Sequence, residues 1–121
     1  MFGFNRSSTN DPSNLTPTEA SEKLKVGKKN TILLDVRTGP EYKQAHVKGS
    51  LLVPVQELQS QAAKLAAHKT KEVLVICHSG SRSLSARKIL LALGFDDVYN
   101  VVGGVSRWHQ EGLPLEFAKG S

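Results

Sequence analysis

The sequence of 121 residues has little of several residue types: it contains a single cysteine, a single tryptophan and no long apolar run. One cysteine excludes an internal disulfide and a Cys-x-x-Cys redox pair within this chain. The four histidines (46, 68, 78 and 109) lack the spacing of a zinc site, so we expect no metal and no cofactor. No stretch approaches the roughly 18 apolar residues of a membrane span, and the first residues show no signal-peptide core. We therefore expect a cytoplasmic protein that does not bind membranes.

Basic residues are in modest excess, with 16 basic against 11 acidic residues and a formal net charge of +5. The lysines are scattered, and no basic stripe interleaved with aromatic residues indicates a nucleic-acid surface. We expect no nucleic-acid partner, whereas the positive charge favours encounter with small anions. The length suits one domain with a single core, and we expect a monomer. The polar residues 1–14 predict a flexible N-terminal tail, followed by one domain over 15–118.

Strand-like and helical patterns alternate along this domain. Apolar runs at 31–36, 51–54, 73–76 and 98–102 predict strands, and a capping box at Thr16–Glu19 predicts a helix before the first of them. Apolar spacing over 55–67 predicts an amphipathic helix whose alanine-rich face lies in the core. Strands separated by helices form βαβ units, so we expect an α/β fold with a central parallel sheet of about five strands flanked by helices.

The only cysteine directly follows the most apolar of these strands. Residues 73–76 read Val-Leu-Val-Ile, which is typical of a central parallel strand buried on both faces. Cys77 comes next, and the spacing of Ala86, Ile89, Leu90 and Leu93 then predicts a helix. Ligands of open α/β sheets bind at this carboxyl edge of the strands. The sequence therefore places a thiol between a buried strand and a helix N-terminus.

This position favours the thiolate form of cysteine. A helix N-terminus carries unpaired N–H groups and about half a positive charge, and Arg82 adds a full one. Gly80 allows the loop backbone to curl so that successive amides point inward. We therefore expect Cys77 to lie at the bottom of a cup of N–H groups. A buried cysteine with a purely structural role is the alternative that the loop alone leaves open.

The pattern Cys77-x-x-Gly80-x-Arg82-Ser83 resembles the active-site loop of the rhodanese sulfurtransferases. Residues 35–50 are similar to a second rhodanese signature: Asp-x-Arg, then Glu-Tyr, then His and Gly before a strand. Here Ala45 and Ser50 stand where many members have glycine and alanine. A third pattern, Gly-Gly, Trp and Gly-x-Pro over 103–114, also resembles these domains. The likeness covers roughly residues 15–117 and implies a single rhodanese-like domain.

The resemblance implies a sulfurtransferase of the thiosulfate:cyanide type. Cys77 would be the catalytic nucleophile, taking a sulfane sulfur from a small anionic donor such as thiosulfate and holding it as a persulfide. The acceptor would be cyanide, a thiol or a protein, because the chain has no second cysteine to discharge the first. The substrate-binding positions implied are the loop residues His78, Ser79, Gly80, Ser81, Arg82 and Ser83.

Three charged residues of the second signature are expected to support this loop. Asp35 lies at the end of its strand, at the same sheet edge as Cys77, and Arg37 follows it. Glu41 is our candidate for the carboxylate that pairs with Arg82 and holds the loop in shape. Charged residues at strand ends also commonly serve only to tie loops together, and that is the simpler interpretation of all three residues, Asp35, Arg37 and Glu41.

Other functions share parts of this pattern. Phosphatases of the cell-cycle type have five residues between cysteine and arginine, whereas four separate Cys77 from Arg82 here. The shorter loop suits a single terminal sulfur better than the four oxygens of a phosphate. A sulfur-relay carrier for a biosynthetic or tRNA-thiolation pathway remains open, and so does a non-catalytic rhodanese-like binding module, although such modules commonly lack the cysteine.

Overall fold

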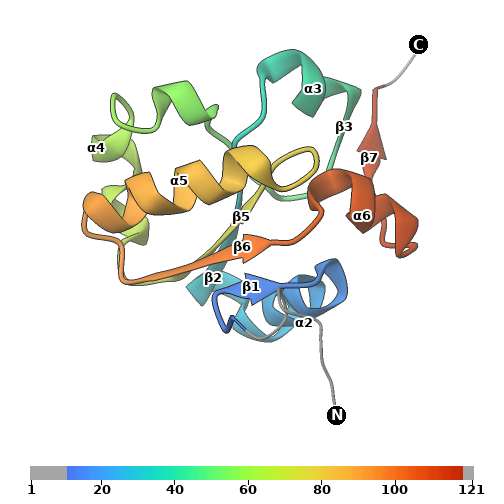
Figure 1. The fold of residues 1–121 in the computed structure, drawn as a ribbon, viewed down its shortest axis with the longest axis horizontal. Helices are drawn as coiled ribbons and strands as arrows, with labels where there is room; N and C mark the ends of the chain where they lie inside the picture. Colours follow the sequence, from blue (N-terminus) through green and yellow to red (C-terminus); the bar gives the residue numbers. More distant parts are fainter. Residues whose placement is uncertain (1–10, 119–121) are drawn as a thin grey trace.

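The computed structural model describes residues 11–118 of the chain (Figure 1). Its core is a five-stranded sheet in the order β1-β6-β5-β2-β4, in which every neighbouring pair is parallel. The strands are Asn14–Leu15 (β1), Thr31–Asp35 (β2), Leu51–Leu52 (β4), Glu72–Ile76 (β5) and Asp97–Val101 (β6). The expected α/β class, with a parallel sheet of about five strands flanked by helices, is confirmed.

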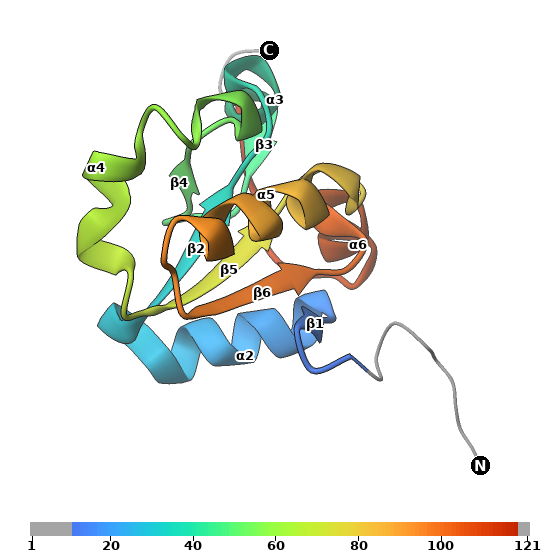
Figure 2. The same ribbon diagram turned by 60° about the vertical axis from the view of Figure 1, so that its left-hand side comes forward.

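The side chains of the central strand β5 alternate between two layers of the core. Val73, Val75 and then Cys77 pack in a cluster that contains Ala86 and Leu90 of α5 (Ser81–Ala92). The residues between them, Leu74 and Ile76, pack instead in a cluster with α2 (Pro17–Gly27) and α6 (Gly104–Gln110). Figure 2 shows α2 and α5 on opposite faces of the sheet. Burial on both faces explains the unbroken apolar run of β5.

Two helices begin with the same local device. In α2, the Thr16 hydroxyl accepts from the Glu19 amide while the Glu19 carboxylate accepts from the Thr16 amide, which confirms the predicted capping box. The helix α3 (Gly39–Gln44) repeats this arrangement with Thr38 and Glu41. Its six residues include none that is fully buried, so α3 is held mainly by contacts outside the apolar core.

The predicted amphipathic helix over 55–67 is wrong. The segment forms three short pieces instead: a 3-10 turn at Val55–Glu57 (η2), one α-helical turn at Ala62–Leu65 (α4) and a second 3-10 turn at Ala66–His68 (η3). Leu58 and Leu65 anchor it in the core, whereas Ala66 is exposed. The Ser60 hydroxyl donates to the Glu57 carbonyl, a local bond that competes with regular helix bonding.

Several smaller features complete the described chain. Another 3-10 turn, Lys28–Asn30 (η1), leads from α2 into β2. Strands Ala45–His46 (β3) and Glu116–Phe117 (β7) pair antiparallel, a contact that the sequence patterns do not predict. The predicted tail falls largely on residues 1–10, which lie outside the described residues, and Asn14 already belongs to β1. Within residues 11–118, no helix combines the length and apolar character needed to cross a membrane.

Candidate active site

Cys77 lies at the carboxyl end of the central strand, where β5 passes into the loop before α5. Because β5 is flanked by β6 and β2, the thiol sits in the middle of the sheet edge rather than at its margin. The residue is almost completely buried, with 1% of its surface exposed. The next two residues, His78 and Ser79, are exposed. A buried sulfur is thus separated from solvent by one short loop.

Two groups of the following loop and helix approach the sulfur. The Gly80 amide donates to Cys77 Sγ at 3.0 Å, and the Ser83 hydroxyl oxygen lies 3.5 Å from the same sulfur. Gly80 has a φ of +113°, a value that residues with a side chain rarely adopt, and this conformation aims its amide inward. Of the predicted cup of N–H groups, one amide, that of Gly80, contacts the sulfur directly in the described residues.

A pair of glycines brings the start of α6 against the loop. Val105 and Ser106 donate their amides to the carbonyls of Cys77 and His78, at 2.8 and 3.0 Å. Gly104 has a φ of +61°, and a Cβ at this position would come within 2.6 Å of the His78 carbonyl carbon. The two backbones thus approach closely here, and this leaves no room for a side chain at Gly104.

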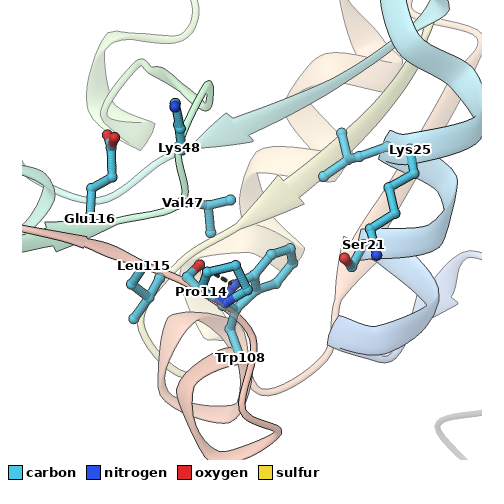
Figure 3. A pocket seen from close by; sticks show the side chains of 9 residues that line it. Ser21, Lys25, Val47, Lys48, Trp108, Pro114, Leu115 and Glu116 are labelled. Carbon is cyan, nitrogen blue, oxygen red and sulfur yellow. Dashed lines mark hydrogen bonds between the residues drawn. The ribbon is translucent and has the colours of Figure 1, made fainter.

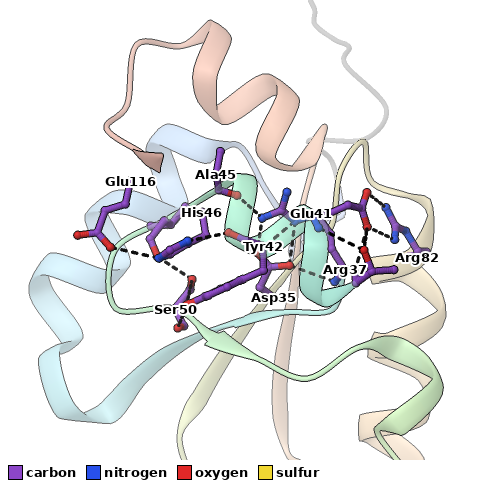
Figure 4. A network of polar contacts seen from close by, with 11 residues as sticks. Asp35, Arg37, Glu41, Tyr42, Ala45, His46, Ser50, Arg82 and Glu116 are labelled. Atoms are coloured by element: carbon purple, nitrogen blue, oxygen red, sulfur yellow. Dashed lines mark hydrogen bonds and ion pairs between the residues drawn. The ribbon is translucent and has the colours of Figure 1, made fainter. Parts of the chain in front are cut away.

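Arg82 is held by Glu41 from the neighbouring helix α3, as Figure 4 shows. The guanidinium donates to both carboxylate oxygens, at 2.7 and 2.9 Å, and about a third of each side chain remains exposed. These hydrogen bonds, helped by those from Thr38, lower the pKa of Glu41 from 4.5 to about 2. The same contact raises the pKa of Arg82. The predicted ion pair exists, and its role in supporting the loop remains a prediction.

Asp35 and Arg37 form a second ion pair that is almost fully buried. Arg37 Nε lies 3.0 Å from Asp35 Oδ1 and its Nη2 lies 2.8 Å from Oδ2, while the two side chains are 4% exposed for Arg37 and 0% for Asp35. Arg37 also donates to the carbonyl of Ala45, just past the end of α3 (Figure 4). The pair therefore ties α3, and with it Glu41, to the end of β2.

His46 occupies a structural position at the end of α3. Its ring stacks on Tyr42 at 3.9 Å between ring centroids, and its Nδ1 lies 2.8 Å from the Tyr42 carbonyl. The Tyr42 hydroxyl donates to the Ser50 carbonyl at 2.7 Å, and His46 Nε2 lies 3.1 Å from the carboxylate of Glu116 in β7. His46 is therefore a hydrogen-bonding residue that links the C-terminal end of α3 to β7.

One polar residue near the site was not singled out from the sequence. Asn100 of β6 is 4% exposed and bonds the hydroxyl of Ser83 through its carbonyl oxygen, while its amide nitrogen donates to Asn14 Oδ1 at 3.1 Å. An asparagine between the apolar residues of a strand is a usable signal, because a buried amide needs partners. The pattern does not indicate which residues those partners are.

The surface has one hollow beside the loop and another away from it. The first, of about 360 Å³, borders the loop and the β1–β6 edge of the sheet, and is lined by Asn14, Ser79, Gly80, Ser81, Leu84, Asn100, Val102 and Gly103. The second, of about 350 Å³, is apolar and lies where α2 meets Trp108 and the segment after α6 (Figure 3). Trp108 is 2% exposed, packs in the core cluster that contains Leu74 and Ile76, and donates to the Pro114 carbonyl.

No group of three or more metal-ligating side chains occurs among residues 11–118. The fold and the site together define an α/β domain whose single thiol lies between a central parallel strand and the N-terminus of the next helix. The chain matches the rhodanese-like domain family over residues 16–111 and belongs to this family. The resemblance noted from its motifs is thereby confirmed.

Relatives of the chain carry names related to sulfur transfer. Thiosulfate sulfurtransferase 16, chloroplastic, of Arabidopsis thaliana is 34% identical over 115 residues, covering 87% of this chain and 93% of the relative. Putative sulfur carrier protein YrkF of Bacillus subtilis is 40% identical over 76 residues, covering 63% of this chain but only 40% of the relative. The crystal structure of a rhodanese-related protein from Thermoplasma volcanium superposes with a TM-score of 0.75 at 29% identity, covering 85% of this chain and 96% of that one.

Proposed function

We propose that this protein is a sulfurtransferase that carries a sulfane sulfur on Cys77. The observation that carries this proposal is the contact between the Gly80 amide and Cys77 Sγ at the N-terminus of α5. An N–H donor and the positive end of a twelve-residue helix stabilise negative charge on sulfur. The sulfurtransferase and sulfur carrier names of relatives support a sulfur-transfer role in general.

The first step is attack of the Cys77 thiolate on the outer sulfur of a donor such as thiosulfate. A bond forms between Sγ and the sulfane sulfur, while the bond between the two donor sulfurs breaks and its electron pair leaves with sulfite. The products are sulfite and an anionic Cys77 persulfide, so atoms and charge balance. Covalent catalysis of this kind divides one difficult transfer into two easier ones.

The loop then has to hold a negatively charged terminal sulfur. A hydrogen bond to a charged group contributes about 1.5–3 kcal/mol, and Arg82 adds positive charge to the first turn of α5. Glu41 neutralises part of that charge but fixes the guanidinium in place. The hollow of about 360 Å³ beside the loop, lined in part by Ser79, Gly80 and Ser81, is large enough for a small anion.

The second step removes the sulfur to an acceptor outside the chain. A thiolate or cyanide attacks the terminal sulfur, the S–S bond of the persulfide breaks, and Cys77 regains its electron pair as a thiolate. Because the sequence has one cysteine, no second thiol of this chain can discharge it. A sulfur-relay carrier, which receives sulfur from a partner's persulfide, is the second candidate, and the relative named as a sulfur carrier favours it.

Intact mass spectrometry distinguishes these functions. We expect the native protein to gain the mass of one sulfur atom in thiosulfate and to lose it, with release of thiocyanate, when cyanide is added. The Cys77→Ser variant should gain nothing. If sulfur loads only from the persulfide of a cysteine desulfurase, the relay role replaces the thiosulfate reaction. Failure to load from either donor contradicts sulfur transfer and supports a binding module.

A further inference from the structure

The buried hydroxyl of Ser83 links Cys77 to two polar side chains, Asn100 and Asn14. Ser83, in the first turn of α5, is 0% exposed, and its oxygen lies 3.5 Å from Cys77 Sγ and 3.1 Å from the Gly80 carbonyl oxygen. The same hydroxyl donates a hydrogen bond to Asn100 Oδ1, which connects α5 to β6. Within residues 11–118, this hydroxyl is the side-chain group that hydrogen-bonds the sulfur.

Ser83 has one proton to donate and more than one acceptor for it. The Gly80 carbonyl accepts only, and a Cys77 thiolate also accepts only. While Asn100 Oδ1 faces Ser83, that oxygen competes for the same proton. The Ser83 oxygen is then free to accept from the S–H of a protonated Cys77. This arrangement suits the thiol better than the thiolate.

Asn100 can reverse this preference because it is an amide. A half turn of its side chain exchanges the carbonyl oxygen with the NH₂ group, two ends of nearly the same shape. The NH₂ group would then donate to the Ser83 oxygen and leave the hydroxyl proton to the strongest remaining acceptor, the charged sulfur. At the far end lies Asn14, an amide that carries both a donor and an acceptor.

We propose that Asn100 is a positioning residue that decides, through the Ser83 hydroxyl, whether a hydrogen bond reaches the Cys77 sulfur. With the thiol, the bonds run from sulfur to Ser83 to the oxygen of Asn100. With the thiolate, they run from the nitrogen of Asn100 to Ser83 to sulfur. The hydroxyl and amide protons stay on their own atoms, and only the S–H proton leaves, to water.

The charged side chains of Arg82 and Asp35 near Cys77 each form an ion pair with a neighbouring residue. Arg82 on α5 is paired with Glu41 of α3, and Asp35 at the end of β2 is paired with Arg37. His78 in the loop is exposed, and the start of α6 contributes backbone amides to the loop carbonyls. From β6 the polar contact is the neutral Asn100. Changing its donor capacity therefore alters the sulfur environment without removing either ion pair.

The test uses the pH dependence of Cys77 alkylation by iodoacetamide, which reports the thiolate without any sulfur donor. Asn100→Asp keeps the shape of the side chain but removes its NH₂ donor. We expect the midpoint of the rate profile to rise by about one pH unit, the size that loss of a charge-assisted hydrogen bond gives. A role confined to stability would lower the melting temperature and leave the midpoint in place, which would overturn the proposal.

A double-mutant cycle separates the hydrogen bond from the negative charge that the Asn100→Asp substitution introduces. In the Ser83→Ala background the path through the hydroxyl is gone, so the proposal predicts that Asn100→Asp shifts the midpoint less than half as far. Equal shifts in both backgrounds mean that the carboxylate acts directly through space, and the proposal is then wrong.

A measurement on the native protein covers the case in which the variant does not fold. With ¹⁵N-labelled asparagine, the side-chain NH₂ resonances of Asn100 should move at the same pH midpoint as alkylation, and should not move there in Cys77→Ser. If the Asn100 NH₂ chemical shifts do not change at the pH midpoint of Cys77 alkylation, the inference is wrong. The inference rests on the proposed function for its importance, but not for its test. If no sulfur loads and the midpoints behave as expected, the proposed function fails alone.

Discussion

Helices α2 and α3 begin with the same motif but are held in the molecule in different ways. Each has a threonine N-cap that exchanges hydrogen bonds with a glutamate three residues later. α2 buries Pro17 and Ala20 and packs against the apolar core. α3 buries none of its residues and is held by Arg37, by the Tyr42 hydroxyl and by the pair between Glu41 and Arg82.

The difference shows how one local motif can acquire a second use. Within residues 11–118, the exposed Glu19 makes no ion pair, so its carboxylate serves the cap of α2. Glu41 serves the cap of α3 and also binds Arg82, which belongs to the loop and helix around Cys77. We infer that polar anchoring of α3 places the Glu41 carboxylate beside the loop around Cys77, which apolar packing alone would not specify.

The largest effect is expected from the buried anchor of α3. Arg37→Met leaves the Asp35 carboxylate buried without its partner, so the free energy of unfolding should fall by about 3–5 kcal/mol. Urea unfolding measures this. Lys23→Met is the matched control, because it breaks a pair with Glu72 that is about one-third exposed and should cost at most about 1 kcal/mol. Similar losses in the two variants would remove the distinction between the anchors.

A smaller effect on stability, with a larger one on the proposed activity, is expected from the ion pair beside the Cys77 loop. Glu41→Gln keeps an oxygen for the cap of α3 but loses the charge that fixes Arg82. Thiocyanate formation should slow roughly fivefold, the rate equivalent of about 1 kcal/mol, while stability changes by less than that. Glu19→Gln makes the same change in the cap of α2 and should leave the rate unaltered. An unchanged rate in Glu41→Gln would end the loop-support hypothesis.

The Tyr42 hydroxyl tests the polar anchoring of α3 without touching a charge. Tyr42→Phe removes the hydrogen bond to the Ser50 carbonyl and keeps the ring that stacks on His46. We expect a loss of about 1 kcal/mol in the free energy of unfolding. A neutral or stabilising substitution would show that α3 does not depend on this contact.

The smallest expected effect is a change in stability at acid pH. The pKa of Glu41 lies at about 2 in the folded protein, below its ordinary 4.5, so the pair with Arg82 stabilises the fold above pH 4.5. This contribution is lost as the pH falls from about 4.5 towards 2. The melting temperatures of the native protein and Glu41→Gln should therefore converge over that range. A difference that stays constant down to about pH 2 would contradict the assigned cause.

Local patterns predicted much of this molecule because their causes are local. The apolar run of β5, the capping box of α2 and the turn at Gly80 each depend on neighbours within a few residues. The helix expected over 55–67 failed because alanines at helical spacing carry little driving force for burial, and Ser60 offered a competing bond. The spacing of apolar residues alone did not reveal either cause.

Contacts between distant segments needed more than pattern. The partner of Arg82 lies 41 residues away, and Glu41 was proposed from a family resemblance rather than from spacing. The bond from Ser83 to Asn100 joins a helix to a strand 17 residues further on, and no local signal pairs a buried amide with a particular hydroxyl. The contacts around the sulfur are therefore only partly predictable from the sequence.

The central claim is that sulfur passes through a covalent intermediate on Cys77. Initial rates of thiocyanate formation, measured over a range of thiosulfate at several fixed cyanide concentrations, test it most directly. A persulfide that forms before the acceptor binds predicts parallel lines in the double-reciprocal plot, the ping-pong pattern. Intersecting lines would require donor and acceptor to be bound together, and would contradict transfer through Cys77.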